Sequence, residues 1–364
     1  MHKTLHKVEQ VIENFINENK IPGLSLHIVS DGESIFTFDY GYSNIELKKP
    51  MQQDTVSSIM SISKSFTAIA MLHLEENTDF NLDTPIIEYL PYFSTKSGRY
   101  NKITSKHILS HTAGFPDNIW LVTLLDNGLH KFAKNLPEYQ FIFKQCPYIE
   151  DTITKIKSRE DITKYFSNID LAYEPGKGWL YCTDAYVILA DVLEKISGLT
   201  WEEYVTENIM KPLNMNNTYI NPSKVSSYNM NEYYLYSKGD FIKIPTPNNQ
   251  LGAPVGFIYS TANDMAKYLI AIMRSEQIII SQLSRSKMFS MIAQREAGLS
   301  YGLGWKIKKF RDTKVIEHAG GYPGVSSFAS MIPAKTFGLV MLSNIGDAPL
   351  QILSDNIVDI FHPY

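Results

Sequence analysis

The sequence predicts a mixed α/β (α+β) protein, in which an antiparallel β-sheet is flanked by N- and C-terminal helices and carries an inserted, mainly helical domain. Strand-like runs lie near both ends of the chain, the middle is rich in helical patterns, and each terminal region carries an amphipathic helix. We therefore expect residues 1–80 and 215–364 to form the sheet domain and residues 81–214 the inserted domain. A site between two such units would lie at their seam.

The N-terminal part begins with a predicted helix and two paired strands. Apolar residues recur at helical spacing over residues 5–16, which predicts a helix that packs on the body of the protein. Residues 23–30 and 34–40 are typical of strands, and the Asp-Gly pair between them is a hairpin signal. The apolar run 66–74 predicts the next helix.

The middle of the chain combines helices with an aromatic stretch. Residues 118–170 predict either a wall over a substrate pocket or a smaller core beneath long loops. The aromatic residues of this stretch are Trp120, Phe132, Tyr139, Phe141, Phe143, Tyr148, Tyr165 and Phe166. A helix over 185–196 follows, and Ser197-Gly198 is a good signal for its end.

The C-terminal part predicts four strands and a last helix. The short spacings between the strands favour antiparallel hairpins. The expected strands are 303–307, 314–318, 327–332 and 337–342. The helix expected over 349–361 carries one apolar stripe, which would cover a face of the sheet.

Composition and charge argue against several classes of protein. The chain has 364 residues, 44% of them hydrophobic, and a net charge of −4 without a dense Lys/Arg cluster, so nucleic acid and anionic membranes are poor partners. No apolar run approaches the length of a membrane span, about 18 residues. The N-terminus lacks the apolar core of a signal peptide, which predicts a cytoplasmic protein. Cys146 and Cys182 are too few and too far apart for a disulfide framework.

Ser61 and Lys64 form the most informative local pattern. Positions i and i+3 of a helix lie on one face, with Cβ atoms about 5–6 Å apart, so a hydroxyl and an amine placed there can share a proton. Free N–H groups at a helix N-terminus would favour an oxyanion at Ser61. The pattern predicts an acylating serine hydrolase with a lysine base. Lowering the Lys64 pKa to about 7–8 by burial corresponds to roughly 3–4 kcal/mol.

A simpler interpretation treats Ser61 as a helix N-cap. The spacing alone is weak, because Ser284-Arg285-Ser286-Lys287 repeats it in a charged and polar setting that predicts a solvated helix surface. The choice between the two interpretations depends on the rest of the chain.

Several further segments occur together in a fixed order and resemble the serine β-lactamase and penicillin-binding-protein family, in particular its class C β-lactamase-related branch, which includes esterases, D-aminopeptidases and DD-peptidases. The resemblance covers almost the whole chain and implies an antiparallel sheet flanked by helices plus an all-helical domain. The segments are Gly41-Tyr42-Ser43-Asn44, Asp54-Thr55, Ser61-Ile62-Ser63-Lys64, 108–116, 174–181, 259–265, Tyr301-Gly302-Leu303-Gly304-Trp305 and 318–324.

The resemblance implies that Tyr181 is the catalytic tyrosine, sharing a proton with Lys64 and Ser61. The alternative is a buried aromatic at a helix entrance. Thr183 stands where the family usually has asparagine, and its shorter hydroxyl puts amide substrates and rapid β-lactam turnover in doubt. Asp184 could replace the asparagine, although its position suits helix capping better.

The third family motif is matched by His318-Ala319-Gly320, with histidine in place of lysine. The resemblance implies that the N–H groups of Gly321 and Ser61 form an oxyanion hole, and that Gly320 lets substrate approach closely. His318 would contact substrate as a weaker carboxylate anchor than lysine. The alternative is a strand-end histidine bonded to backbone.

These observations predict a hydrolase that forms an acyl-enzyme at Ser61 and cleaves a small ester or amide, as an esterase or a D-amino-acid-selective peptidase. One alternative is a D-Ala-D-Ala carboxypeptidase or β-lactamase, and another is a catalytically weak binding or assembly module of the same fold. The expected partner is a small molecule or short peptide. No metal-binding motif or cofactor motif occurs. The sequence leaves the oligomeric state and the choice between hydrolase and acyl transferase open.

Overall fold

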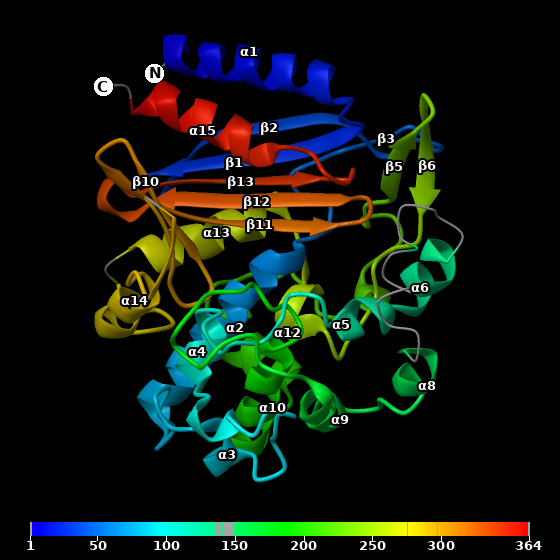
Figure 1. Ribbon diagram of the computed structural model, residues 1–364. Coiled ribbons are helices and arrows are strands. Elements are labelled where there is room, and N and C mark those ends of the chain that lie inside the picture. The colour runs from blue at the N-terminus through cyan, green and yellow to red at the C-terminus, as the bar shows by residue number, and fades with distance from the viewer. Residues whose placement is uncertain (1, 135–139, 141–148, 275, 297, 363–364) are drawn as a thin grey trace.

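The structure is a computed structural model that describes residues 2–134, 140, 149–274, 276–296 and 298–362 (Figure 1). Cys146 and four of the aromatic residues named above, Tyr139, Phe141, Phe143 and Tyr148, lie outside the described residues. The strands are β1 (Gly23–Ser30), β2 (Glu33–Asn44), β3 (Lys49–Pro50), β4 (Ser57–Ser58), β5 (Tyr233–Ser237), β6 (Asp240–Ile244), β7 (Tyr259–Ser260), β8 (Ala293–Glu296), β9 (Leu299–Tyr301), β10 (Lys306–Phe310), β11 (Thr313–Tyr322), β12 (Val325–Ile332) and β13 (Phe337–Ser343).

Helices make up most of the remaining regular structure. The α-helices are α1 (His2–Asn19), α2 (Ser63–Asn77), α3 (Ile86–Tyr89), α4 (Ser105–Leu109), α5 (Leu121–Leu124), α6 (Asn127–Ala133), α8 (Ile149–Ile153), α9 (Arg159–Tyr165), α10 (Tyr186–Ser197), α11 (Trp201–Val205), α12 (Ala253–Gly256), α13 (Ala262–Met273), α14 (Gln282–Met288) and α15 (Leu350–Phe361). The short 3₁₀ turns are η1 (Met60–Ile62), η2 (Tyr100–Lys102), η4 (Phe166–Asn168), η6 (Pro222–Lys224) and η7 (Pro333–Lys335), and η5 (Thr206–Met210) is a π-helical turn after α11. No described helix combines the length and the apolarity needed to cross a bilayer.

The described strands form one large antiparallel sheet in the order β3-β2-β1-β13-β12-β11-β10-β9-β8, together with two small two-stranded pairs. The terminal helices α1 and α15 cover one face, where Val8 and Ile12 of α1 and Leu353 of α15 join one apolar cluster with the sheet (Figure 1). Helix α13 packs on β1 and β13 from the other face. The predicted fold class is confirmed.

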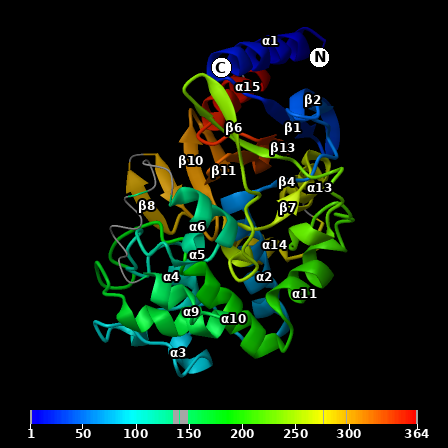
Figure 2. The ribbon, with the colours of Figure 1, turned by 90° about the vertical axis from the view of Figure 1, so that its right-hand side faces the viewer.

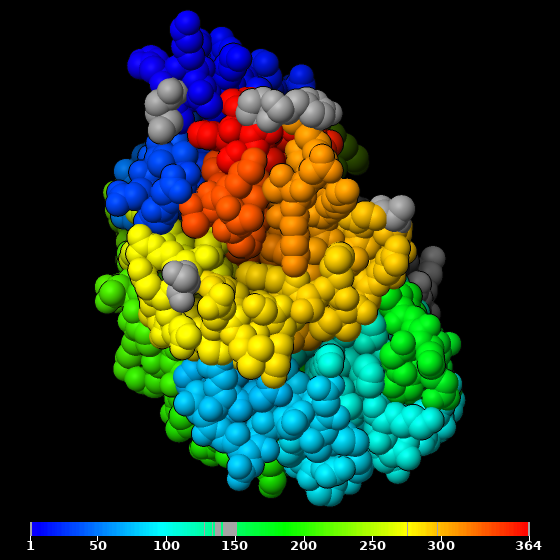
Figure 3. Space-filling model, turned by 90° about the vertical axis from the view of Figure 1, so that its left-hand side faces the viewer, coloured from blue at the N-terminus to red at the C-terminus, as the bar shows by residue number. Residues whose placement is uncertain are grey.

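Two parts of the sheet differ from the prediction. The strand expected at 303–307 begins only at Lys306, because Gly304 has a φ of 75° and the Gly302 N–H donates to the Trp305 carbonyl at 2.9 Å, which makes this stretch a turn. In addition, β8 and β9 extend the sheet edge beyond β10. Figure 3 shows this side of the molecule, where orange and yellow residues lie between the dark blue and red terminal segments at the top and the light blue and cyan segments at the bottom.

Helix α2 lies at the centre of the helical region. Its residues from Ser63 to Leu72 are all buried, including the polar Lys64 and Thr67, and α10, α11, α12 and α14 pack around it (Figure 2). The described aromatic residues of the 118–170 stretch also join this core: Phe166 is fully buried, and Trp120, Phe132 and Tyr165 pack against it. The division of the chain at residues 81–214 stays a prediction.

The C-terminal part of β11 does not pair with β10, and it lies beside the start of α2. Strand β10 pairs with β11 from Thr313 to Glu317 only, whereas β12 pairs with β11 as far as Tyr322. The turn η1, which precedes α2, packs against β11 and β12. The end of β11 therefore lies beside η1, and the two segments bring the predicted site residues together.

Candidate active site

Ser61 lies in η1, and Lys64 follows it in the first turn of α2. Met60, just before Ser61, has a φ of 45°, an uncommon value for a residue with a side chain, and makes a sharp entry to the helix. The Lys64 Nζ lies 3.0 Å from the Ser61 Oγ and donates to the Val255 carbonyl at 2.7 Å. The amine and the hydroxyl are thus within proton-transfer distance.

Burial controls the charge of Lys64. The side chain has no exposed surface, and the loss of hydration lowers its pKa from 10.5 to about 7. The negative charge of Asp184 opposes this shift. Near neutral pH a large fraction of Lys64 is therefore an uncharged amine, able to accept a proton.

Tyr181 completes the group. The Lys64 Nζ lies 5.1 Å from the centroid of its ring. Burial raises the pKa of Tyr181, while an interaction with the Ser61 hydroxyl opposes the shift, so the phenol keeps its proton near neutral pH. The structure thus brings Ser61, Lys64 and Tyr181 into one cluster, as the proposed chemistry requires.

The two glycines of β11 differ sharply in their surroundings. A Cβ on Gly320 would lie 2.2 Å from the Ser327 Oγ and 2.3 Å from the Ile59 carbonyl oxygen, so only glycine fits there. A Cβ on Gly321 would meet nothing within 4 Å. Gly320 therefore allows β11 to pack against the residue before η1, whereas Gly321 borders open space.

His318 is held by two hydrogen bonds within the protein. Its Nδ1 donates to the Ala319 carbonyl at 2.7 Å, so its Nε2 accepts from the Tyr301 hydroxyl at 2.9 Å. Burial is the main cause that lowers its pKa to about 3, and the charges of Lys64 and Lys306 act in the same direction. The ring is neutral and both nitrogens are occupied, so the substrate contact expected of His318 stays a prediction that would require one of these bonds to break.

Thr183 and Asp184 lie just before α10 and have different environments. Thr183 is half-buried, and its hydroxyl makes no hydrogen bond to any residue that the structure describes. The Asp184 carboxylate is buried and accepts the Val122 N–H at 2.7 Å, and burial raises its pKa to about 6. Asp184 is therefore bound to the backbone at the start of α5, which leaves Thr183 with the free hydroxyl.

Comparison with known proteins identifies the family. A model of the Beta-lactamase family matches residues 8–359. The chain belongs to the Beta-lactamase family. It is 25% identical over 328 residues to penicillin-binding protein 4* of Bacillus subtilis strain 168, covering 86% of this chain and 66% of that protein. It is 24% identical over 356 residues to the Flp protein of Staphylococcus aureus strain N315, covering 96% and 65%. This Beta-lactamase-family chain thus spans just under two-thirds of the length of these relatives.

Two solved structures share the fold. The octameric penicillin-binding protein homologue from Pyrococcus abyssi superposes with a TM-score of 0.80 at 24% identity, covering 98% of this chain and 77% of that one. The penicillin binding protein from Bacillus halodurans superposes with a TM-score of 0.74 at 22% identity, covering 96% and 98%. The sheet and helices described above are therefore those of this family, while the class C-related branch stays a prediction.

Sequence reasoning missed several members of the site. The Val255 carbonyl is a backbone atom, which no side-chain pattern could indicate. Tyr301 lies in a family segment but its bond to His318 was not foreseen. An aromatic wall surrounds Tyr181, with ring centroids 4.1 Å away at His111 and 6.4 Å away at Trp179. The only signal for this wall was the aromatic character of the matching segments.

His111 has a structural role. Its φ is 58°, and its Nδ1 accepts the N–H of Cys182 at 3.2 Å, which ties this loop to the one that carries Tyr181. Cys182 is buried, and burial raises the pKa of its thiol. The thiol therefore stays protonated near neutral pH and is a poor nucleophile.

The second Ser-x-x-Lys match differs from the first. Lys287 on α14 forms an ion pair with Glu75 at 2.8 Å. Ser284 is buried rather than solvated, and its N–H donates to the Ser281 hydroxyl in the first turn of α14. In the part of the chain that the structure describes, no cluster of three or more His, Cys, Asp or Glu side chains could hold a metal ion.

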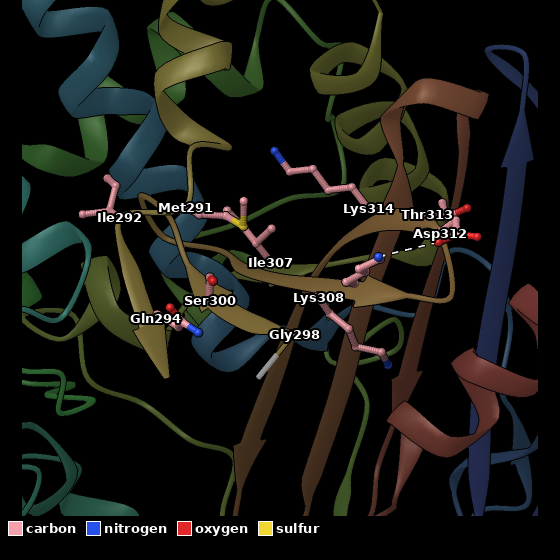
Figure 4. Close-up of a pocket in the computed structure, with 11 residues that line it drawn as sticks. Met291, Ile292, Gln294, Gly298, Ser300, Ile307, Lys308, Asp312, Thr313 and Lys314 are labelled. Atoms are coloured by element: carbon pink, nitrogen blue, oxygen red, sulfur yellow. Dashed lines mark ion pairs between the residues drawn. The ribbon is translucent and has the colours of Figure 1, made fainter. Parts of the chain in front are cut away.

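A separate cavity of about 620 Å³ lies on the outer edge of the sheet (Figure 4). Gln294 of β8, Ser300 of β9 and Lys314 of β11 contribute to its lining, together with Met291 and Ile292 before β8. None of Ser61, Lys64 or Tyr181 belongs to this lining, so the cavity is distinct from the site at η1.

Proposed function

We propose that this chain is a serine hydrolase that forms an acyl-enzyme at Ser61 and cleaves a small ester or amide, as an esterase or a D-amino-acid-selective peptidase. The observation that carries the proposal is the 3.0 Å contact between the Lys64 amine and the Ser61 hydroxyl, together with the lowered Lys64 pKa. A merely structural N-cap serine would not need a desolvated amine beside it.

In the proposed acylation step, Lys64 Nζ accepts the Ser61 proton while Ser61 Oγ attacks the substrate carbonyl carbon. The Val255 carbonyl, 2.7 Å from Nζ, orients the amine and stabilises the ammonium that forms. The negative charge that develops on the substrate oxygen is bound by the N–H groups of Ser61 and Gly321. Each such donor typically contributes about 2.7–4 kcal/mol in the transition state.

The leaving group then takes a proton from the neutral Tyr181 phenol, and Lys64 returns its proton to Tyr181. The acyl-enzyme ester and the free alcohol or amine are the products of this half-reaction. In deacylation, water attacks the ester carbon, and the same residues pass its proton back to Ser61 Oγ. Because its raised pKa keeps Tyr181 in the phenol form near neutral pH, Lys64 is the group that can accept the Ser61 proton.

A D-Ala-D-Ala carboxypeptidase or β-lactamase is the second candidate, and the name of the penicillin-binding relative favours it. The absence of the usual asparagine at Thr183 favours ester cleavage instead, because a single hydroxyl cannot contact both Lys64 and a substrate carbonyl as a carboxamide can. The candidates can be ranked by the initial rates at which the protein hydrolyses three substrates at equal concentration: nitrocefin, a p-nitrophenyl ester and a D-amino-acid p-nitroanilide.

The test of an acyl-enzyme is covalent labelling by a fluorescent phosphonate, followed by intact-protein mass. Wild type should gain one label, and Ser61→Ala none. Ser286→Ala is the matched control, because its hydroxyl lies exposed on α14 within the second Ser-x-x-Lys match and should leave labelling unchanged. Equal labelling of Ser61→Ala and wild type, or no labelling by phosphonate or penicillin, would contradict the proposal and favour a binding module.

A further inference from the structure

Arg295 is an exposed cation whose side chain is held against the wall of the site. Its guanidinium carbon lies 4.1 Å from the centroid of the Trp179 ring. The Trp179 ring in turn lies 6.4 Å from that of Tyr181 and 6.0 Å from that of Tyr301, centroid to centroid. A guanidinium placed over an indole keeps its N–H edges available for hydrogen bonds.

A bulge in β8 gives Arg295 this direction. Gln294 pairs with Ser300 and Glu296 pairs with Leu299, so Arg295 is the extra residue between two ladder positions. Bulges next to active sites commonly redirect one side chain. Gln294, one position earlier, lines the separate cavity of Figure 4, whereas Arg295 does not and reaches Trp179 instead.

Among the residues that the structure describes, Arg295 has no negatively charged partner. It forms no ion pair with any residue that the structure describes. Burial lowers the pKa of His111, and the positive charges of Lys64 and Arg295 act in the same direction, so the field of Arg295 reaches the site. His318, which occupies the position of the family's lysine, is neutral and has both nitrogens bonded within the protein.

We propose that Arg295, seated on Trp179, binds a carboxylate of the substrate and thereby selects anionic esters or amides. This inference rests on the proposed acyl-enzyme function. A guanidinium pairs with a carboxylate through two parallel N–H···O bonds, which fixes orientation as well as charge. Because the rings of Trp179 and Tyr181 separate Arg295 from Ser61, the carboxylate must lie several bonds from the scissile carbonyl.

The test compares matched neutral and anionic esters. On the acyl side the pair is 4-nitrophenyl octanoate and mono-4-nitrophenyl suberate, and on the leaving-group side it is methyl 3-acetoxybenzoate and 3-acetoxybenzoate. In Arg295→Gln, the anionic-to-neutral ratio of kcat/KM should fall about 10- to 100-fold for at least one pair, with the neutral ester little affected. Arg295→Lys should lose less, because it keeps the charge without the planar fork.

Lys309→Gln is the control for a general loss of positive charge, because Lys309 lines the separate cavity on β10 and its exposed amine faces Asp312 at 3.6 Å. The anionic-to-neutral ratio of kcat/KM in Lys309→Gln should match that of wild type. Unchanged ratios in Arg295→Gln for both pairs, or an equal fall in Lys309→Gln, would overturn the inference while the neutral esters are still cleaved. If wild type cleaves neither member of either pair, the proposed function fails first and this inference fails with it.

Discussion

The pH dependence of acylation is the most direct test of the Lys64 base. Moving its pKa from 10.5 to about 7 corresponds to about 5 kcal/mol of lost stabilisation of the ammonium relative to the neutral amine. The structure attributes this shift mainly to burial, because Lys64 is fully enclosed and has the Val255 carbonyl and the Ser61 hydroxyl as its hydrogen-bond partners.

The expected profile follows from the sign of that shift. Below pH 7 Lys64 is protonated and cannot accept the Ser61 proton, so kcat/KM for a neutral ester should fall about tenfold per pH unit. Above pH 7 the amine is neutral and the rate should level off. The titratable groups that face Lys64 or act on its charge are Cys182, Asp184, Tyr181, Tyr186, His111 and His318.

Asp184→Asn perturbs this pKa without removing a catalytic group. The carboxylate of Asp184 raises the Lys64 pKa, so its loss should move the midpoint of the profile to lower pH, while the amide oxygen can still accept the Val122 N–H. Asp191→Asn is the matched control, because Asp191 is a buried carboxylate of α10 that accepts a bond from Tyr92. A wild-type midpoint near 10, or a midpoint that rises in Asp184→Asn, would refute the reasoning.

The remaining predictions concern β11 and the phenol. Gly320→Ala should lower the free energy of unfolding by about 1–3 kcal/mol in denaturant titration, because its Cβ would overlap Ser327 Oγ and the Ile59 carbonyl. Gly321→Ala should keep wild-type stability yet lower kcat/KM, since its methyl enters the open space beside the site; equal destabilisation of both variants would contradict this. Tyr181→Phe should slow phosphonate labelling about 10²–10⁴-fold with an unchanged melting temperature, and near-normal turnover would remove Tyr181 from the mechanism.

Much of the sheet could be predicted because its strands carry their own signals. The runs expected at 327–332 and 337–342 fall within β12 and β13, which are buried along their whole length and are mostly apolar. The helix expected over 349–361 is α15, which begins at Leu350. In each case local periodicity and burial agree, so the sequence pattern was sufficient.

The edge strands could not be predicted for the opposite reason. Strand β8 has the sequence Ala-Gln-Arg-Glu, mostly polar and exposed, without apolar alternation. It exists because β9 offers a partner, and β9 pairs in turn with β10. A strand stabilised by its neighbour rather than by its own buried face leaves little trace in the sequence.

The residues of the site also differ in how far the sequence could predict them. Spacing pointed to Ser61 and Lys64, because their proximity follows from one helical turn, but the family segments were needed to distinguish them from Ser284 and Lys287. Tyr181 lies more than a hundred positions later, and only the family resemblance connected it to them. The carbonyl of Val255 and the bond from Tyr301 to His318 depend on packing between distant segments, which no local pattern records.

Contacts between distant segments also determine how the family's third motif is used in this chain. We match His318 on β11 to that motif by resemblance, but burial lowers its pKa and both ring nitrogens are bonded, to Tyr301 and the Ala319 carbonyl, so this side chain is neutral and supplies no cation. The exposed positive charge beside the aromatic wall comes instead from Arg295, at a bulge in an edge strand. If charge recognition has moved from the motif to this bulge, substrate preference in such chains cannot be judged from the motif, and the residue stacked on Trp179 must be considered as well.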